Sequence, residues 1–155
     1  MLFINLLLAL VWTFLTGAAT PNTLLEGFAV GYLVLWLASP LYGTSTYFRK
    51  FRQAVSFFVF FLQELIIATL RVAYVVVKPR ISIRPGIVAV PLDVRTNAEI
   101  TLLANLITLT PGTLTLDISD DRRVMYVHVM DVDDVDAFRQ EIKQGFERRV
   151  GELLR

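Results

Sequence analysis

The chain has 155 residues, of which 55% are hydrophobic and only 19% are charged. This is too apolar for an ordinary soluble domain of that length, so we expect part of the chain to lie in a bilayer. The formal net charge of +1 excludes the strongly basic surface that nucleic-acid binding needs. Because the sequence has no cysteine, disulfides, thiolate metal sites and cysteine nucleophiles are excluded as well.

The charged residues are concentrated in the second half of the chain. Before Arg49 the only charged side chain is Glu26, whereas residues 93–155 contain twelve of the fourteen acidic residues. Long apolar stretches with few charges, as in the first half, are typical of membrane helices. We therefore expect two parts: transmembrane helices over residues 1–78 and a cytoplasmic α/β domain over residues 79–155.

The first two membrane helices are predicted at about residues 1–19 and 24–39. A cleaved signal peptide is the alternative for the first, but no basic region precedes its apolar stretch. The second is only about 24 Å long, short for a hydrocarbon core of about 30 Å, so the two helices should form a short hairpin. Gly27 and Gly31 form a GxxxG step that allows a neighbouring helix to approach closely, which makes them candidate partner-interface residues.

Residues 53–77 are predicted as the third membrane helix, the anchor of the chain. Glu64 and Arg71 lie inside it, seven positions apart and so on about the same face. Ionisable groups within a span usually face protein or water. One hypothesis assigns Glu64 to an ion or proton relay. The other, which we favour, pairs Glu64 with a basic group on a neighbouring subunit while Arg71 extends toward the membrane surface.

Charge alone does not determine how the chain is oriented in the membrane. Basic residues flank the third helix on both sides: Arg49, Lys50 and Arg52 precede it, and Lys78, Arg80 and Arg84 follow it. We expect the C-terminal domain on the cytoplasmic side, because a domain kept there needs neither translocation nor disulfides.

The second part of the chain is predicted as a small α/β domain. Its first strand, residues 87–93, has Pro91 near its end, which suits an edge strand or a bulge. The sequence TNAE at residues 96–99 has the spacing of a capping box. A helix should therefore begin there and run to about Leu109, before Pro111.

A hairpin and a final helix complete this domain. Residues 113–119 and 124–131 each alternate with the period of a half-buried strand, and residues 120–123 form the turn between them. The apolar positions of the first of these strands are Leu114, Leu116 and Ile118. Asp133 or Asp134 should cap the last helix. The order β-α-β-β-α predicts an open α/β sandwich with helices on one face of a mixed sheet.

The helix predicted at residues 96–109 is apolar on two faces. One face carries Ile100, Leu103, Ala104 and Ile107; the other carries Leu102, Leu106 and Leu109. One sheet covers only one face of a helix, so the second face is predicted to contact a partner protein.

No residue pattern in the sequence indicates catalysis. His128, the only histidine, lies near Asp131, but a structural histidine is more common in a strand than a metal or proton-handling site. The threonines, proline and glycine of residues 108–113 either present hydroxyls to a ligand or end the helix, and we favour the helix end. Phosphate loops, dinucleotide motifs and serine elbows are absent from the sequence. We expect no enzymatic activity, no cofactor and no metal site.

Four blocks of sequence resemble a known family. They are PGIVAVPLDV at residues 85–94, LLANLITLTPGT at residues 102–113, LDISDDRRVMYVHVMD at residues 116–131 and FERR at residues 146–149. With them the chain resembles the E-type subunit of the Mrp-type multisubunit sodium/proton antiporters of bacteria, over essentially its whole length. The ITLTPGT block with the YVH that follows is specific, whereas the apolar helices are not.

The resemblance implies membership in a plasma-membrane complex of several unlike subunits, whose large members resemble the proton-pumping subunits of respiratory complex I and carry the ion. For this chain it implies a non-catalytic role in supporting assembly and sodium/proton exchange, and a cytoplasmic C-terminal domain. It carries over no catalytic residue. The alternative is a stand-alone membrane-tethered domain that senses a ligand or an ion.

Overall fold

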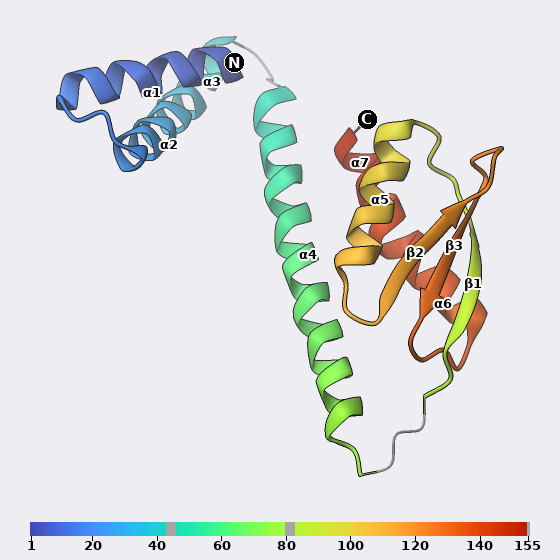
Figure 1. Ribbon diagram of the computed structural model, residues 1–155. Coiled ribbons are helices and arrows are strands. Elements are labelled where there is room, and N and C mark those ends of the chain that lie inside the picture. Colours follow the sequence, from blue (N-terminus) through green and yellow to red (C-terminus); the bar gives the residue numbers. More distant parts are fainter. Residues whose placement is uncertain (43–45, 80–82, 155) are drawn as a thin grey trace. The chain divides into compact units, whose positions relative to one another are not determined.

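The computed structural model describes residues 1–42, 46–79 and 83–154, which belong to two compact units, Met1–Arg52 and Gln53–Arg155 (Figure 1). The first unit is helical, and the second joins most of a long helix to a three-stranded sheet with its helices. The boundary after residue 78 was predicted as the division between membrane and aqueous parts and stays a prediction, whereas the two compact units divide inside the long helix. Arg80, in the second basic group, lies outside the described residues.

The first unit is built on a helical hairpin, as predicted. Helix α1, Leu2–Thr16, packs on α2, Pro21–Leu37, and the short α3, Ser39–Tyr42, follows. Helix α2 begins three residues earlier than predicted, because Thr20 and Thr23 form a capping box in which each side chain accepts from the other's backbone N–H. Pro21 occupies the first helical position, where its missing N–H costs nothing.

Gly27 and Gly31 bring α2 close to α1. Both are buried, and a Cβ at Gly27 would lie 2.8 Å from the carbonyl oxygen of Ala9. A Cβ at Gly31 would overlap the side-chain oxygen of Asn5. Asn5 is fully buried and donates from Nδ2 to the Tyr47 hydroxyl at 2.9 Å. The GxxxG step therefore serves helix packing within this chain.

Helix α4, Thr46–Val77, begins seven residues before the predicted start. The basic residues at 49, 50 and 52 belong to the helix, because lysine and arginine are good helix formers and no glycine or proline interrupts them. Among the described residues, Tyr47–Val77 is the single stretch long and apolar enough to cross a membrane. Helices α1 and α2 have 15 and 17 residues, so three membrane-crossing helices are not confirmed.

The sheet is antiparallel throughout, not mixed as predicted. Its strands are β1, Gly86–Pro91, β2, Thr113–Ile118, and β3, Val124–Val129, in the order β1-β3-β2. Strand β3 returns from the hairpin into the space between β1 and β2 and pairs antiparallel with both. The parallel strands β1 and β2 are therefore not neighbours. Pro91 ends an edge strand, as its missing N–H requires.

Strand β2 turns its leucines away from the helices. Thr113 and Thr115 lie on the inner side, where their hydroxyls donate to the carbonyls of Ile107 at 2.7 Å and Ala104 at 3.2 Å. Leu114 and Leu116 are exposed. A shift in register between residues 115 and 117 then changes the alternation, so that Ile118 returns to the core side.

The helices α5, Asn97–Leu109, α6, Val135–Ile142, and α7, Arg148–Leu154, cover the inner face of the sheet. A π-helical segment, Lys143–Glu147, joins α6 to α7. The core lies between these layers and is made of Val88, Val90, Leu92, Val94, Ile100, Leu103, Leu106, Ile107, Met125, Val127, Val129, Ile142, Phe146 and Val150. The predicted capping box of α5 and the hairpin turn are both confirmed.

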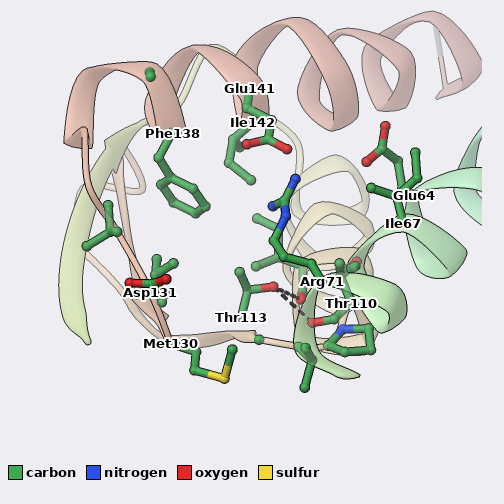
Figure 2. A pocket seen from close by; sticks show the side chains of 18 of the residues that line it. Glu64, Ile67, Arg71, Thr110, Thr113, Met130, Asp131, Phe138, Glu141 and Ile142 are labelled. Carbon is green, nitrogen blue, oxygen red and sulfur yellow. Dashed lines mark hydrogen bonds between the residues drawn. The ribbon is translucent and has the colours of Figure 1, made fainter. Parts of the chain in front are cut away.

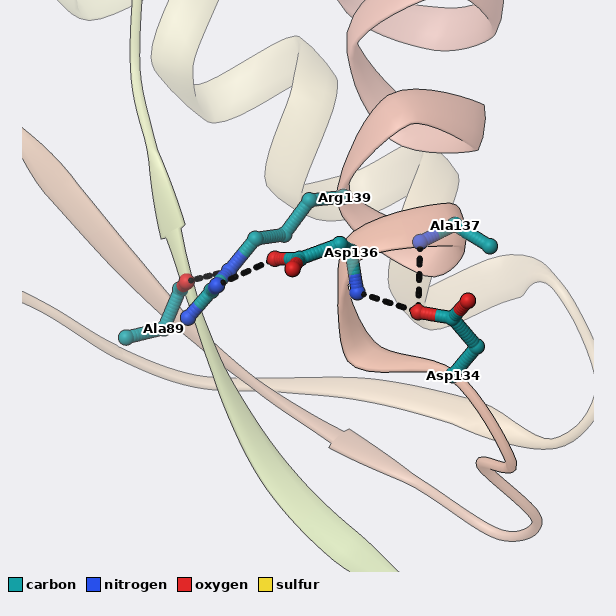
Figure 3. Close-up of polar contacts among 5 residues, drawn as sticks. All are labelled: Ala89, Asp134, Asp136, Ala137 and Arg139. Carbon is teal, nitrogen blue, oxygen red and sulfur yellow. Dashed lines mark hydrogen bonds and ion pairs between the residues drawn. The ribbon is translucent and has the colours of Figure 1, made fainter.

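Asp134 caps α6, one of the two residues predicted for that role. Its carboxylate accepts from the backbone N–H groups of Asp136 and Ala137 (Figure 3). In the first turns of the same helix, Arg139 donates to the Asp136 carboxylate at 2.8 Å and, from Nε, to the carbonyl of Ala89 at 2.9 Å. The helix is thereby attached to the outer edge of β1.

Two buried glutamates hold the connection between β1 and α5. Glu147 accepts from the backbone N–H of residues 93 and 94, at 2.5 and 3.0 Å. Glu99 accepts from the N–H of residues 95 and 96, both at 3.0 Å. Their residues are only 3% and 2% exposed. Four successive backbone donors are thus bonded by carboxylates, one from the π segment and one from α5.

Replacing Glu147 by Leu should destabilise the second unit by roughly 2–3 kcal/mol, because the buried N–H of Val94 loses its acceptor. The measurement is denaturant unfolding of the purified chain in mild detergent, followed by circular dichroism. Glu152→Leu, at an exposed position of α7, is the control and should change the free energy of unfolding by less than about 0.5 kcal/mol. Equal unfolding midpoints for the two variants would contradict the role given to Glu147.

Candidate functional site

A cavity of about 340 Å³ lies in the second unit, between α4 and the α/β domain (Figure 2). Most of its wall is apolar. The charged residues that line it are Glu64, Arg71, Asp131, Asp133, Asp134 and Glu141. Glu64 and Arg71 come from α4, and the four others come from the β3–α6 connection and from α6. The cavity is therefore apolar inside with a mainly acidic rim.

Glu64 and Arg71, the two ionisable residues predicted to share a face of the third helix, both line this cavity. In Figure 2 the Arg71 side chain reaches up toward Glu141, with Glu64 beside it on α4. Within the described residues, the structure gives neither Glu64 nor Arg71 an ion pair or a side-chain hydrogen bond. Two opposite charges on the apolar helix thus face protein but lack a partner.

The other acidic residues of the rim already have structural roles. Asp131 accepts from the backbone N–H of Arg84 at 2.9 Å, and Asp133 forms an ion pair with the Arg84 guanidinium at 2.6 Å. Asp134 caps α6. Among the described residues, no group of three His, Asp or Glu side chains is placed to hold a metal ion. Of the charged residues lining the cavity, Glu64, Arg71 and Glu141 have no ion pair or side-chain hydrogen bond with the residues that the structure describes.

Aromatic residues attach α4 to the domain, a contact that was not predicted from the sequence. Phe60 meets Phe146 edge to face, with ring centroids 5.5 Å apart. The Arg149 guanidinium lies over the Phe60 ring, 4.0 Å from its centroid. Phe57 and Phe61 also pack against the core. The signal was present in the spacing of Phe57, Phe60, Phe61 and Glu64, which share one face of a helix.

The threonine-rich loop after α5 uses its hydroxyls within the chain. Thr110 donates to the carbonyl of Leu106 at 2.8 Å, and Thr113 donates to the carbonyls of Ile107 and Thr110. The Thr108 hydroxyl accepts from the N–H of Thr115 at 3.3 Å. These bonds satisfy carbonyls that the helix end leaves open, which favours a helix stop over a ligand loop.

The three leucines predicted to contact a partner lie in different surroundings. Leu106 is 5% exposed and belongs to the chain's own core, because α5 is covered by α7 and by the π segment as well as by the sheet. It is therefore not a surface residue, and that prediction was wrong. Leu102 is half-buried against the core, and Leu109 is 62% exposed.

A helix long and apolar enough to cross a membrane, joined to a small α/β domain, is the architecture of a membrane-associated protein. The family model described as "Na+/H+ ion antiporter subunit" matches residues 5–153. This chain belongs to that family, as an E-type subunit of the Mrp antiporters.

Curated relatives match along their full length. The chain is 35% identical to the E-type subunit of the Na(+)/H(+) antiporter of Alkalihalophilus pseudofirmus, over 99% of this chain and 98% of that protein. It is 38% identical to the E1-type subunit of the Na(+)/H(+) antiporter of Staphylococcus haemolyticus, over 98% and 96%. The resemblance noted in the sequence is confirmed.

Two solved complexes contain similar chains. One is the membrane-bound sulfane sulfur reductase, an archaeal respiratory membrane complex, with a TM-score of 0.63, 29% identity, and coverage of 99% of this chain and 98% of that one. The other is the Mrp complex from Dietzia sp., with a TM-score of 0.51, 30% identity, and coverage of 66% of this chain and 96% of that one. Both solved structures are of complexes.

Leu106→Asp and Leu109→Asp should differ sharply in their effect on folding. A charge at position 106 would be buried in the core, so we expect a loss of more than about 3 kcal/mol of stability, whereas the exposed position 109 should tolerate it within about 0.5 kcal/mol. Denaturant unfolding and limited proteolysis of the two purified variants measure the difference. Equal stability would show that Leu106 is not a core residue.

Proposed function

We propose that this chain is a non-catalytic accessory subunit of a multisubunit Na+/H+ antiporter in the bacterial plasma membrane, where it supports assembly and ion transport. The observation that carries the proposal is the outward side of α4. Leu70 and Val77 there are 64% and 81% exposed, and Phe58, Ile66 and Tyr74 are exposed as well. This side holds no charged residue between residues 53 and 77. It requires lipid or the helices of other subunits.

The membrane arrangement that fits this role has three crossing helices and a cytoplasmic C-terminal domain. Helix α4 is about 48 Å long at ~1.5 Å per residue, which exceeds the hydrocarbon thickness of about 30 Å. Helices α1 and α2 are about 22 and 26 Å long by the same measure. A mismatch of several ångströms is accommodated by local thinning of the bilayer or by contact with neighbouring helices.

The side of α4 that faces the domain is also suited to contact the helices of another subunit in the assembled complex. A domain with a charged surface is costly to bring into hydrocarbon, so we propose that, in the assembled complex, the part of α4 at the depth of the membrane core contacts helices of other subunits instead of the domain. Phe57, Phe60 and Phe61 are apolar enough to meet helices of another subunit in its place. Glu64 and Arg71, which lack ion-pair partners in the described part of the chain, would then receive polar partners from those helices.

For Glu64 we therefore propose an ion pair with a basic group of a neighbouring subunit. This choice is supported because, among the described residues of the chain, no basic group lies within ion-pair distance of Glu64. A role in an ion or proton relay is the second hypothesis, supported by the position of a carboxylate on an apolar helix.

Purification of the tagged chain from its native membrane in mild detergent tests the proposed function. The expected result is a complex several times larger than 17.6 kDa that contains unlike subunits. Antiport activity lost in a deletion strain should return with the plasmid-borne chain. A solitary, fully active chain of monomeric mass would instead favour the ligand- or ion-sensing domain.

Replacing Glu64 by Gln separates its two proposed roles. If Glu64 forms an ion pair with a partner subunit, the variant leaves a buried cation unpaired, which costs about 2 kcal/mol or more, and less of the chain co-purifies with the complex. Sodium-driven proton movement per assembled complex should then stay normal in membrane vesicles. Full assembly with lost transport would support the relay and contradict the ion pair. Glu152→Gln, at an exposed position of α7 outside the cavity, is the matched control.

A further inference from the structure

The face of the sheet turned away from the helices carries a patch of apolar side chains. Ile87 of β1 and Leu114 of β2 lie on either side of His128 of β3 in the register, and they are 66% and 43% exposed. Leu116 and Tyr126, also exposed, extend the patch along the hairpin. We call these five residues the outer face. No helix in the described part of the chain covers it (Figure 1).

The orientation of β2 is unusual for a solvated sheet. In an antiparallel sheet with one wet face, polar side chains normally point to water and apolar ones to the core. Here Thr113 and Thr115 point to the helices, and Leu114 and Leu116 point outward. The inward threonines are explained by their bonds to α5, but no helix in the described part of the chain covers the outward leucines. The outer face is therefore suited to another apolar surface.

On both edge strands of the sheet, backbone groups that an added strand would need are already bonded or missing. At β1 the carbonyl of Ala89 accepts from Arg139 (Figure 3), and Pro91 has no N–H to offer. At β2 the N–H of Thr115 is bonded to the Thr108 hydroxyl. An added strand would need these groups, so a partner packs on the face of the sheet and does not extend it by strand pairing.

We propose that the outer face docks the apolar side of an amphipathic helix from another subunit of the antiporter complex; this rests on the proposed function. Three strands at about 4.8 Å spacing make a surface roughly 14 Å wide, which holds one helix of about 10 Å diameter. The helix would complete a helix–sheet–helix sandwich, with the outer-face leucines between its side chains.

The size of the outer face argues against a second copy of this chain as its occupant. Strands of six residues are about 20 Å long, so the face covers roughly 280 Å². Two such faces bury far less than the roughly 1,200 Å² of a stable interface. A subunit already held in the same complex does not need that area, because its effective concentration is high.

The experiment uses single-cysteine variants, which are informative because the natural sequence has no cysteine. Leu114→Cys places one thiol on the outer face, and Gln140→Cys places one on the exposed side of α6 as a control. Each full-length variant is labelled with a polar maleimide in two forms: inside the purified complex, and alone in phosphatidylglycerol/phosphatidylethanolamine vesicles. A photo-crosslinker attached to the same thiol, with mass spectrometry of the product, identifies what touches it.

The proposal expects the Leu114→Cys thiol to react at least about tenfold more slowly in the complex than in vesicles, with the control unchanged. The crosslink should join it to a helical segment of an unlike subunit. Equal labelling rates in the complex and in vesicles would overturn the proposal. Recovery of an intact complex in the same experiment would still support the proposed function. Protection in the vesicles of the chain alone, or a crosslink to a second copy, would assign the face to lipid or to self-association and also overturn it. Failure to recover any complex would contradict the proposed function and, with it, this inference.

Discussion

The α/β domain depends on one short segment in which four successive backbone amides are bonded by two buried carboxylates. Glu147 holds residues 93 and 94, and Glu99 holds residues 95 and 96. The segment leaves β1 and starts α5, so these bonds fix where the sheet ends and how the helix begins. They also tie the last helix to the first strand across more than fifty residues. These bonds fix the position of α5 relative to the sheet, and the apolar core packs between the helices and the sheet.

The second unit gives α4 two unlike sides. The side with the aromatic residues, Glu64 and Arg71 faces the domain, and the opposite side carries only uncharged residues between 53 and 77. In the isolated chain, Glu64 and Arg71 thus line the cavity, and the opposite side of α4 is left as an exposed apolar surface. The apolar side suits lipid or the helices of other subunits, and membership of a multisubunit antiporter family supplies both.

The features predicted correctly from the sequence are those that depend on residues close together in the chain. The capping box at residues 96–99, the Asp134 cap, the hairpin and the edge position of Pro91 each follow from a few neighbouring residues. The candidate site was found in part: the seven-residue spacing placed Glu64 and Arg71 on one face, but the acidic wall opposite them comes from residues far away in the chain. The sheet order, the inward threonines and the burial of Leu106 also depend on distant partners, which periodicity does not reveal.

The π segment Lys143–Glu147 determines which side chains of the last helix turn inward. A π turn contains one residue more than an α turn. Compared with a regular α-helix, the helix therefore has one extra residue at this point and is not interrupted. An α-helix turns about 100° per residue, and everything after the insertion is rotated by that angle. The rotation is what allows Phe146 and Val150 to enter the core while Arg149 reaches the Phe60 ring. A chain with one residue fewer here would have a regular helix and would bring a different set of side chains to its membrane anchor.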